Sequence, residues 1–309
     1  MSGVNRNGVL MVLDWGTTNV RAALLDKDGT PLDEKRGESG VGELSTGQFA
    51  ARFDELTQGW PEVPAIAAGM IGSRQGWHEA DYLACPASPA NLSSALHQFA
   101  HGDRSISIVP GLKLDDGIRF DVMRGEESQL AGFLTSNANY SGTIVMPGTH
   151  SKWVNIRDGV ISSFRTYMTG ELFEAISEHT ILRHSVSIQD APDDTFASTA
   201  ASLAAKSGSI EGQLFGLRAR HLLGSGDEKE LRQELSALLI MAEIRAGEQD
   251  GFVLSGETIL IGTEGLTAFY ETALAALGHK TKREKGTTLV WPALFAMARE
   301  AGLIEKVST

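Results

Sequence analysis

The residues that could do chemistry in this chain gather in two short polar turns, each directly after an apolar run. Glycine lets a ligand approach the backbone closely, and threonine and serine add hydroxyl groups to the N–H groups of the turn. Backbone N–H groups arranged in this way bind phosphate. The candidate phosphate ligands are Gly16, Thr17 and Thr18 in the first turn and Gly148, Thr149 and Ser151 in the second.

Asp14 ends the first apolar run, immediately before the first turn. Mg²⁺ prefers oxygen ligands and keeps several of its waters, so a carboxylate beside a phosphate turn can hold it directly or through water. We therefore predict that Asp14 is a metal ligand. The alternative is a structural aspartate that caps its own turn.

Glu126 is the candidate catalytic base. It follows Gly125 at the predicted start of a helix, and phosphoryl transfer to a hydroxyl needs a carboxylate that orients the hydroxyl and accepts its proton. Glu127 competes for this role, because adjacent helix residues point about 100° apart and only one can face a substrate. Both acids also suit the positive end of the helix dipole, which is the purely structural alternative.

The elements that position these residues form a pattern that occurs twice. Each copy has an apolar strand, a Gly-Thr turn, a second strand, an Asp-Gly turn at 28–29 or 158–159, and a third strand. Asp-Gly between apolar strands is a strong hairpin signal. Two such hairpins resemble the actin-like ATPase fold of sugar kinases, chaperones and actin. The resemblance implies an α/β protein in which two actin-like (ribonuclease H-like) domains face each other across a nucleotide cleft.

Strands alternate with helices along the chain, which predicts parallel sheets with helical cover. We expect a first domain at 1–136 and a second at 137–309 that carries the nucleotide site, with the last helix returning to the hinge. Predicted helices lie near 48–58, 89–99, 126–136, 170–182, 194–223, 228–247, 266–277 and 292–301.

The composition is that of a globular protein, with 309 residues, 42% hydrophobic and 21% charged. No apolar run is long enough to span a membrane, and residues 1–8 lack the apolar core of a signal peptide, so we expect a cytoplasmic protein with no membrane partner. The net charge of −12 argues against nucleic acid as a partner. The single cysteine, Cys85, excludes an intrachain disulfide.

The sequence contains neither a P-loop nor a dinucleotide-binding glycine motif, so nucleotide binding depends on the two turns. A third small turn, Gly262-Thr263, leads into a predicted helix and would let a flat purine lie against the backbone. The basic segment 279–285 is interpreted as a solvent-exposed edge strand.

Several segments, in order over most of the chain, resemble the 2-dehydro-3-deoxygalactonokinase family. They are DWGTTNVR at 14–21, AGMIGS at 68–73 with Gly76-Trp77, IVPG at 108–111, VMRGEESQL at 122–130, MPGTHSKWV at 146–154, FRT at 164–166, MTGEL at 168–172 and the turn at 262–263 with 266–268. The Arg-Gly-Glu-Glu and Met-Pro-Gly-Thr-His segments are specific to this family. The C-terminal end departs from it, because Gly286-Thr287 stands where the family commonly has Gly-Asp.

The resemblance implies a kinase that uses ATP and Mg²⁺ to phosphorylate 2-dehydro-3-deoxy-D-galactonate at its terminal hydroxyl, giving the 6-phosphate in D-galactonate catabolism. The sugar-acid site is expected in the first domain. An arginine fork suits the substrate carboxylate. The candidate substrate residues are Arg124, Arg165 and Arg74 for the carboxylate and Ser73, Trp77 and Tyr82 for the sugar pocket.

Two other functions stay open from the sequence. One is an N-acetylhexosamine or hexose kinase of the same superfamily, and the other is a non-catalytic, ATP-binding sensor. The sequence also leaves open which epimer of the keto-acid is preferred and the oligomeric state, a homodimer included.

Overall fold

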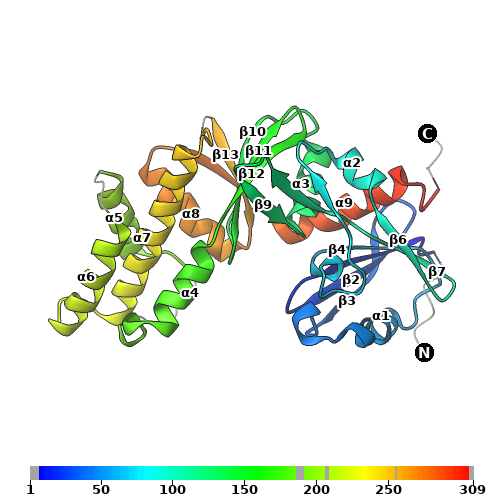
Figure 1. Cartoon of the computed structure of the whole chain (residues 1–309), viewed down its shortest axis with the longest axis horizontal. Coiled ribbons are helices and arrows are strands. Elements are labelled where there is room, and N and C mark those ends of the chain that lie inside the picture. The colour runs from blue at the N-terminus through cyan, green and yellow to red at the C-terminus, as the bar shows by residue number, and fades with distance from the viewer. Residues whose placement is uncertain (1–6, 186–190, 206–208, 255, 306–309) are drawn as a thin grey trace. The chain divides into compact units, whose positions relative to one another are not determined.

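The computed structural model describes residues 7–185, 191–205, 209–254 and 256–305. The chain forms two compact units. Unit 1 contains the described residues of Met1–Tyr140, Arg157–Ser162 and Thr287–Thr309, and unit 2 contains those of Ser141–Ile156 and Ser163–Gly286. Both units mix helices and strands, as the sequence predicts (Figure 1). The predicted boundary between residues 136 and 137, and the predicted cleft, stay predictions.

The large sheet of unit 1 is built around the first predicted hairpin. Its strands, in the order β3-β2-β1-β4-β7-β6, are β3 (Pro31–Gly37), β2 (Val20–Leu25), β1 (Leu10–Trp15), β4 (Ala65–Ala68), β7 (Arg104–Ile108) and β6 (His97–His101). β1 pairs antiparallel with β2 and parallel with β4. Because Asp14 and Ala68 are register partners, β1 and β4 end at the same edge of the sheet.

Unit 1 also contains a smaller sheet and several helices. The smaller sheet has the order β5-β8-β9, with β5 (Tyr82–Ala84), β8 (Gly111–Asp115) and β9 (Phe120–Met123). The helices are α1 (Phe49–Thr57), α2 (Pro89–Ser94), α3 (Glu126–Ser136) and α9 (Gly286–Glu300), with 3₁₀ turns at Val41–Glu43, Thr46–Gln48 and Met70–Gly72. α3 and α9 are in close contact, since a Cβ at Gly132 would lie 2.0 Å from the carbonyl oxygen of Leu289.

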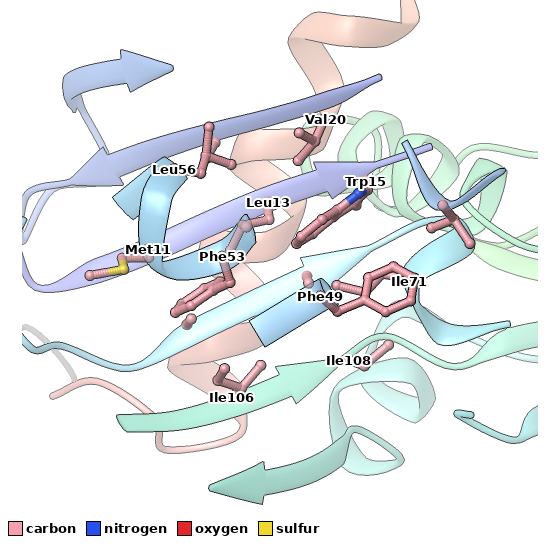
Figure 2. Packing of buried hydrophobic residues seen from close by; sticks show 14 of the residues in the cluster. Met11, Leu13, Trp15, Val20, Phe49, Phe53, Leu56, Ile71, Ile106 and Ile108 are labelled. Carbon is pink, nitrogen blue, oxygen red and sulfur yellow. The ribbon is translucent and has the colours of Figure 1, made fainter. Parts of the chain in front are cut away.

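The core of unit 1 lies between the large sheet and α1 (Figure 2). Met11, Leu13 and Trp15 alternate along β1 and pack in one cluster with Phe49 and Phe53, which are one helical turn apart on α1. Each of these side chains is exposed by 1% or less. Burial of one such side chain contributes about 1.5–3 kcal/mol to stability. The cluster therefore fixes β1 in place, and with it the position of Asp14 at its end.

The sheet of unit 2 repeats this arrangement. Its strands, in the order β12-β11-β10-β13-β14, are β12 (Val160–Tyr167), β11 (Ser151–Arg157), β10 (Gly142–Met146), β13 (Glu257–Gly262) and β14 (Lys280–Lys285). β10 pairs antiparallel with β11 and parallel with β13, as β1 pairs with β2 and β4. The duplicated hairpin pattern of the sequence therefore corresponds to two sheets with the same order around the first strand.

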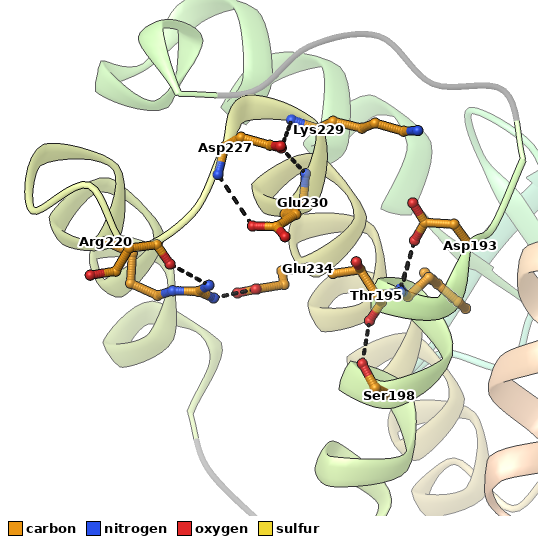
Figure 3. Close-up of polar contacts among 10 residues, drawn as sticks. Asp193, Thr195, Ser198, Arg220, Asp227, Lys229, Glu230 and Glu234 are labelled. Carbon is orange, nitrogen blue, oxygen red and sulfur yellow. Dashed lines mark hydrogen bonds and ion pairs between the residues drawn. The ribbon is translucent and has the colours of Figure 1, made fainter.

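Side-chain caps mark the starts of α5 (Asp194–Ala204), α6 (Ile210–Leu222) and α7 (Glu228–Gln249) in unit 2, and Figure 3 shows two of them. Unit 2 also contains α4 (Thr169–His179) and α8 (Glu264–Ala276), with a 3₁₀ turn at Ile181–His184. The Asp193 carboxylate accepts a hydrogen bond from the N–H of Thr195 at 2.9 Å, and Asp227 accepts one from the N–H of Glu230 at 2.9 Å. An ion pair between Arg220 and Glu234 joins α6 to α7.

Most predicted elements are confirmed within a few residues, but the prediction of one helix over 89–99 is wrong. α2 ends at Ser94, and His97–His101 forms β6, which pairs antiparallel with β7. Pairing with a strand that follows it in the chain overrides the local helical signal. The smaller sheet of unit 1 was not predicted either, because its strands are only three to five residues long.

The later elements differ less from prediction. The helical region predicted at 194–223 consists of α5 and α6, and its residues 206–208 lie outside the described residues. The last helix begins at Gly286, earlier than predicted, and Pro292 lies inside it. The basic segment is the edge strand β14, as predicted.

Among the described residues, no helix combines the length and the apolar character that crossing a membrane requires. The predicted lack of a signal peptide concerns residues 1–8, of which 1–6 lie outside the described part of the chain.

Candidate phosphate-binding and catalytic site

The first Gly-Thr turn presents its N–H groups on one side. The carbonyl oxygens of Gly16, Thr17 and Thr18 accept hydrogen bonds from the N–H groups of 40–42, at 3.0, 2.8 and 3.0 Å. In a trans peptide the carbonyl and the next N–H point in opposite directions. The N–H groups of 17–19 therefore face away from 40–42, and residues 17–19 are exposed. This arrangement suits the predicted phosphate contact.

Gly40 is a supporting residue that the sequence analysis missed. A Cβ at this position would lie 2.3 Å from the carbonyl oxygen of Thr17 and 2.4 Å from the backbone nitrogen of Thr18, so only glycine allows this approach. The signal is weak in the sequence, because residue 40 lies in an irregular segment between β3 and a 3₁₀ turn.

We expect Gly40→Ala to displace the first turn and raise the KM for ATP about tenfold or more, because small displacements of binding groups strongly weaken binding. Gly47→Ala is the matched control, since a Cβ at Gly47 has no atom within 4 Å. Steady-state kinetics of both variants at varied ATP concentration measure the effect. Equal KM values for the two variants would show that the turn tolerates the added methyl group.

Asp14 is held by Arg21 at the end of the first hairpin. Arg21 Nη2 donates to Asp14 Oδ2 at 2.5 Å, and the Asp14 side chain stays 28% exposed. Arg21 also donates to the carbonyl of Thr287 at 3.3 Å and lies over the ring of Trp291. A partly exposed carboxylate beside outward N–H groups fits the predicted role of Asp14, which would hold a Mg²⁺ ion that supplies positive charge beside phosphate.

Two glycines bring the start of α3 to the same edge of the sheet. Gly69 directly follows β4, and a Cβ there would lie 2.7 Å from the carbonyl oxygen of Trp15. Gly125 directly precedes α3, and its Cβ would lie 3.5 Å from the Cα of Gly69. Both have positive φ angles, +95° and +107°, which favour glycine. The structure therefore places Glu126 near the end of β1, where Asp14 lies.

The two adjacent glutamates of α3 have different surroundings. Glu126 is partly exposed, and its Oε2 accepts a hydrogen bond from the N–H of Arg124 at 3.1 Å. Glu127 is fully buried and accepts hydrogen bonds from the Gly125 N–H at 2.6 Å and the Ser128 hydroxyl at 3.1 Å. Burial, and then the neighbouring Glu126, raises the pKa of Glu127 to about 8. Glu127 therefore holds the backbone at the start of the helix, and Glu126 is the carboxylate that a substrate could reach.

The raised pKa of Glu127 predicts a pH-dependent stability. Between the ordinary value of 4.5 and about 8, the folded protein binds more protons than the unfolded chain. The free energy of unfolding should therefore decrease as the pH rises through this range, by up to about 1.4 kcal/mol per pH unit. Glu127→Gln should lack this contribution, as measured by denaturant unfolding of both proteins from pH 5 to 8. A difference between them that is constant with pH would contradict the prediction.

Arg124 and Ser73 lie in the same part of unit 1. Arg124 Nη2 donates to the carbonyl of Ala80 at 2.6 Å, its guanidinium lies 4.4 Å from the ring centre of Tyr82, and a Cβ at Gly72 would meet its Nη1 at 2.7 Å. Within the described residues, Arg124 Nε and Nη1 and Ser73 Oγ are buried without a hydrogen-bond partner. Unpaired buried polar groups are costly, so these atoms are candidates for substrate oxygens.

The remaining predicted substrate residues have partners within the protein. Trp77 packs against the core of unit 1, with ring contacts to Phe99 and His101 at 5.1 Å each. Arg74 is largely exposed and lies 3.6 Å from Glu79. Arg165 belongs to unit 2 and pairs with Asp250 at 3.4 Å. Of the two candidate arginines in unit 1, Arg124 lies against Gly72, the neighbour of Ser73 in the chain, and its backbone N–H donates to Glu126.

The second Gly-Thr turn, in unit 2, lies against the start of α4. The Glu171 N–H donates to the carbonyl of Thr149 at 3.1 Å, and a Cβ at Gly170 would lie 2.6 Å from both Gly148 O and Thr149 Cα. The positive end of the α4 dipole therefore lies beside the turn, which favours an anion there. His150, at the tip of the turn, is half-exposed and bonds Glu171 at 2.5 Å.

Ser151 differs from the other candidate phosphate ligands because it is fully buried. Its hydroxyl lies 3.0 Å from the hydroxyl of Tyr270, which donates to the buried Glu243 at 2.6 Å. Burial raises the pKa of Glu243, while hydrogen bonds from Thr169, Tyr270, Trp153 and Ser151 oppose this shift. Burial also raises the pKa of Tyr270 well above its usual value.

The predicted purine turn lies next to the second phosphate turn. β13 runs parallel to β10, so both strands end at the same edge of the sheet, and a Cβ at Gly262 would lie 3.5 Å from the carbonyl oxygen of Pro147. Thr263 is the N-cap residue of α8. A cavity of about 310 Å³ opens at this edge, lined by Gly148, Thr149, Thr169, Gly170, Phe173, Arg232, Ser236, Leu239, Ile240, Leu266, Phe269 and Tyr270.

This cavity has the size and lining of a site for a small organic ligand. The candidate phosphate ligands Gly148 and Thr149 lie at one part of its wall, and apolar side chains of α7 and α8 form much of the rest. Arg232 lies over the ring of Phe173, 3.5 Å from its centre. The sequence analysis named Gly148 and Thr149 of this lining but missed the residues from α4, α7 and α8, because three helices supply them and no local motif marks them. The predicted purine residues Gly262 and Thr263 do not line the cavity.

The fold is the one shared by the class of proteins that contains sugar kinases and actin-like ATPases. Each sheet carries a Gly-Thr turn after its first strand. The activator of the 2-hydroxyisocaproyl-CoA dehydratase from Clostridium difficile has the same fold, with a TM-score of 0.51 at 12% identity over 97% of this chain and 99% of that one. Within this class, the chain belongs to the 2-keto-3-deoxy-galactonokinase family, whose model matches residues 14–297.

Curated relatives agree with this family assignment. A protein of Rhizobium meliloti (strain 1021), named as a probable 2-dehydro-3-deoxygalactonokinase, is 37% identical over 302 residues, 94% of this chain and 97% of the relative. The 2-dehydro-3-deoxygalactonokinase of Escherichia coli (strain K12) is 36% identical over 280 residues, 90% and 93% of the two chains. A crystal structure from Sinorhizobium meliloti, assigned to the same kinase, has a TM-score of 0.88 at 35% identity and covers 94% and 98%. The predicted family is confirmed.

Proposed function

We propose that this protein transfers the γ-phosphoryl group of ATP to the C6 hydroxyl of 2-dehydro-3-deoxy-D-galactonate, in the catabolism of D-galactonate. The family match over residues 14–297 is the observation that carries this proposal. The oxygen of the C6 hydroxyl attacks the γ-phosphorus, the bond from that phosphorus to the β–γ bridging oxygen breaks, and ADP leaves. The hydroxyl proton passes to the base.

Glu126 is the proposed base. Its carboxylate is partly exposed at the start of α3, at the edge of the sheet where Asp14 lies. The outward N–H groups of 17–19 would bind phosphate oxygens there, and Asp14 would hold Mg²⁺ directly or through water. A bound Mg²⁺ supplies positive charge that offsets the charge of the phosphates.

We propose that Arg124 and Ser73 bind the substrate carboxylate and a neighbouring oxygen. The support is chemical, since Arg124 Nε and Nη1 and Ser73 Oγ are donors without a partner in the described protein. A guanidinium offers the forked geometry that matches a carboxylate. Arg165, already paired with Asp250, is a weaker candidate.

The adenosine part of ATP is assigned to the cavity of unit 2. Its lining joins the second phosphate turn to apolar side chains of α7 and α8, which suits a purine attached to a phosphate chain. Gly148 and Thr149 contact the phosphates, and Gly262 and Thr263 support the wall beside the turn. Because the reaction consumes ATP, we propose a cytoplasmic location and a small-molecule sugar acid as the partner.

A coupled assay of ADP release tests the function. The expected result is rapid turnover with 2-dehydro-3-deoxy-D-galactonate, slower turnover with its gluconate-derived epimer, and none with neutral hexoses or N-acetylhexosamines. Mass spectrometry of the product should find one added phosphate on C6. Turnover of neutral hexoses without turnover of the keto-acid would replace the proposed substrate, and ATP binding without turnover of any acceptor would identify a sensor instead.

A further inference from the structure

A buried polar network lies directly beneath the second phosphate turn. Glu243, in the middle of α7, is 4% exposed. Its Oε1 accepts a hydrogen bond from Trp153 Nε1 at 2.7 Å, and its Oε2 accepts one from the hydroxyl of Tyr270 at 2.6 Å. The network therefore joins α7 to β11 and α8, the elements that surround the turn.

The network reaches the turn through Ser151. The hydroxyl of Tyr270 lies 3.0 Å from Ser151 Oγ, and Ser151 Oγ lies 3.4 Å from both the nitrogen and the carbonyl oxygen of Gly148. The Ser151 hydroxyl has one proton, which lies between Tyr270 and Glu243, and its oxygen can accept a hydrogen bond from the Gly148 N–H. Ser151 therefore connects the buried network to the backbone of the turn.

A carboxylate buried in this position costs stability, so its presence indicates a role other than stability. Burying a carboxylate is costly even when it is hydrogen-bonded, and apolar residues of similar size often stabilise a core better. Three partners in the network are exposed by 1% or less: Ser151, Trp153 and Tyr270. Contact with water therefore does not offset the cost of burying the carboxylate there. The network meets the wall of the cavity at the backbone of Gly148 and at Thr169, which also bonds Glu243.

We infer that Glu243, acting through Tyr270 and Ser151, is a positioning residue that holds the Gly148-Thr149 turn in the shape that binds the phosphates of ATP. This inference rests on the proposed function for the use of ATP. It assigns Ser151 a role behind the turn and not in direct contact with phosphate. Tyr270 also lines the cavity, but its hydroxyl points into the network.

The test compares the affinity of the full chain for Mg-ATP and for adenosine by calorimetry. We expect Tyr270→Phe and Ser151→Ala each to weaken ATP binding about tenfold, because the turn that meets the phosphates loses its support. Adenosine binding should change by less than about twofold, because the apolar lining is retained. Thr143→Val is the control, since it removes another buried hydroxyl of unit 2, one that donates to the carbonyl of Val253; it should leave both affinities unchanged.

A double variant gives an independent readout. Tyr270→Phe with Ser151→Ala should bind ATP no more weakly than either single variant, because both remove the same connection. Additive losses would overturn the inference, as would equal weakening of ATP and adenosine or an unchanged affinity for ATP. Glu243→Gln, which keeps the volume, should weaken ATP binding selectively in the same way.

The proposed function and this inference can fail separately. If the wild-type chain binds ATP but phosphorylates no sugar acid, the function is wrong, and the comparison of ATP with adenosine still decides the role of the network. If the wild-type chain is an active kinase and Tyr270→Phe binds ATP normally, the inference alone is wrong.

Discussion

Glu126→Gln is expected to lower kcat by about 10²–10⁴-fold, because a positioned general base contributes a factor of this size. The amide keeps the shape of the side chain and can still accept the hydrogen bond from the Arg124 N–H. ATP affinity and the unfolding midpoint should therefore change little. Single-turnover kinetics with saturating ATP and sugar acid measure the loss in the chemical step.

Glu127→Gln is the matched control for this experiment. With a pKa of about 8, Glu127 is mostly protonated at neutral pH, so a neutral amide reproduces its usual charge. Its kcat should stay within a few-fold of wild type. A large loss for Glu127→Gln together with an active Glu126→Gln variant would exchange the roles of the two residues.

Asp14→Asn is expected to lower kcat/KM by about 10²–10³-fold and to raise the Mg²⁺ concentration needed for half-maximal rate. An amide oxygen is a weaker magnesium ligand than a carboxylate, and the metal carries much of the charge stabilisation in phosphoryl transfer. Titration of the rate with Mg²⁺ at fixed ATP concentration provides the measurement.

The structural alternative for Asp14 is its ion pair with Arg21, and a second variant separates the two roles. Asp33→Asn makes the same chemical change in the same sheet, where Asp33 accepts a hydrogen bond from Trp60 Nε1 at 2.7 Å. It should affect stability and leave the magnesium dependence unchanged. If Asp14→Asn also leaves that dependence unchanged, Asp14 is only the partner of Arg21.

Local patterns predicted the parts of the site that are continuous in the sequence. The Gly-Thr turns and the start of α3 each depend on residues within a few positions of one another, and the fold class followed from the repeated hairpin. The positions predicted for these elements are confirmed. The roles of Glu126 and Asp14 stay predictions, because chemistry at a site is not encoded by local spacing alone.

The parts that sequence analysis missed depend on contacts between distant segments. Gly40 matters because the backbone of Thr17 lies 2.3 Å from where its side chain would begin, and no periodicity marks such a position. The cavity of unit 2 combines residues from α4, α7 and α8, and Phe173 and Arg232 are 59 positions apart in the chain. Glu243 carries no sequence signal, because a glutamate in a long helix is usually exposed.

The assignment of α9 to unit 1 has a consequence for biosynthesis. Apart from Gly286, the helix belongs with residues made at the beginning of translation, and Arg21 donates to the carbonyl of Thr287 within it. A ribosome makes the residues of unit 2 before it reaches this helix. Unit 1 therefore cannot be completed while the nascent chain is still short of its last few tens of residues. A premature stop before residue 286 would damage the half of the molecule encoded first.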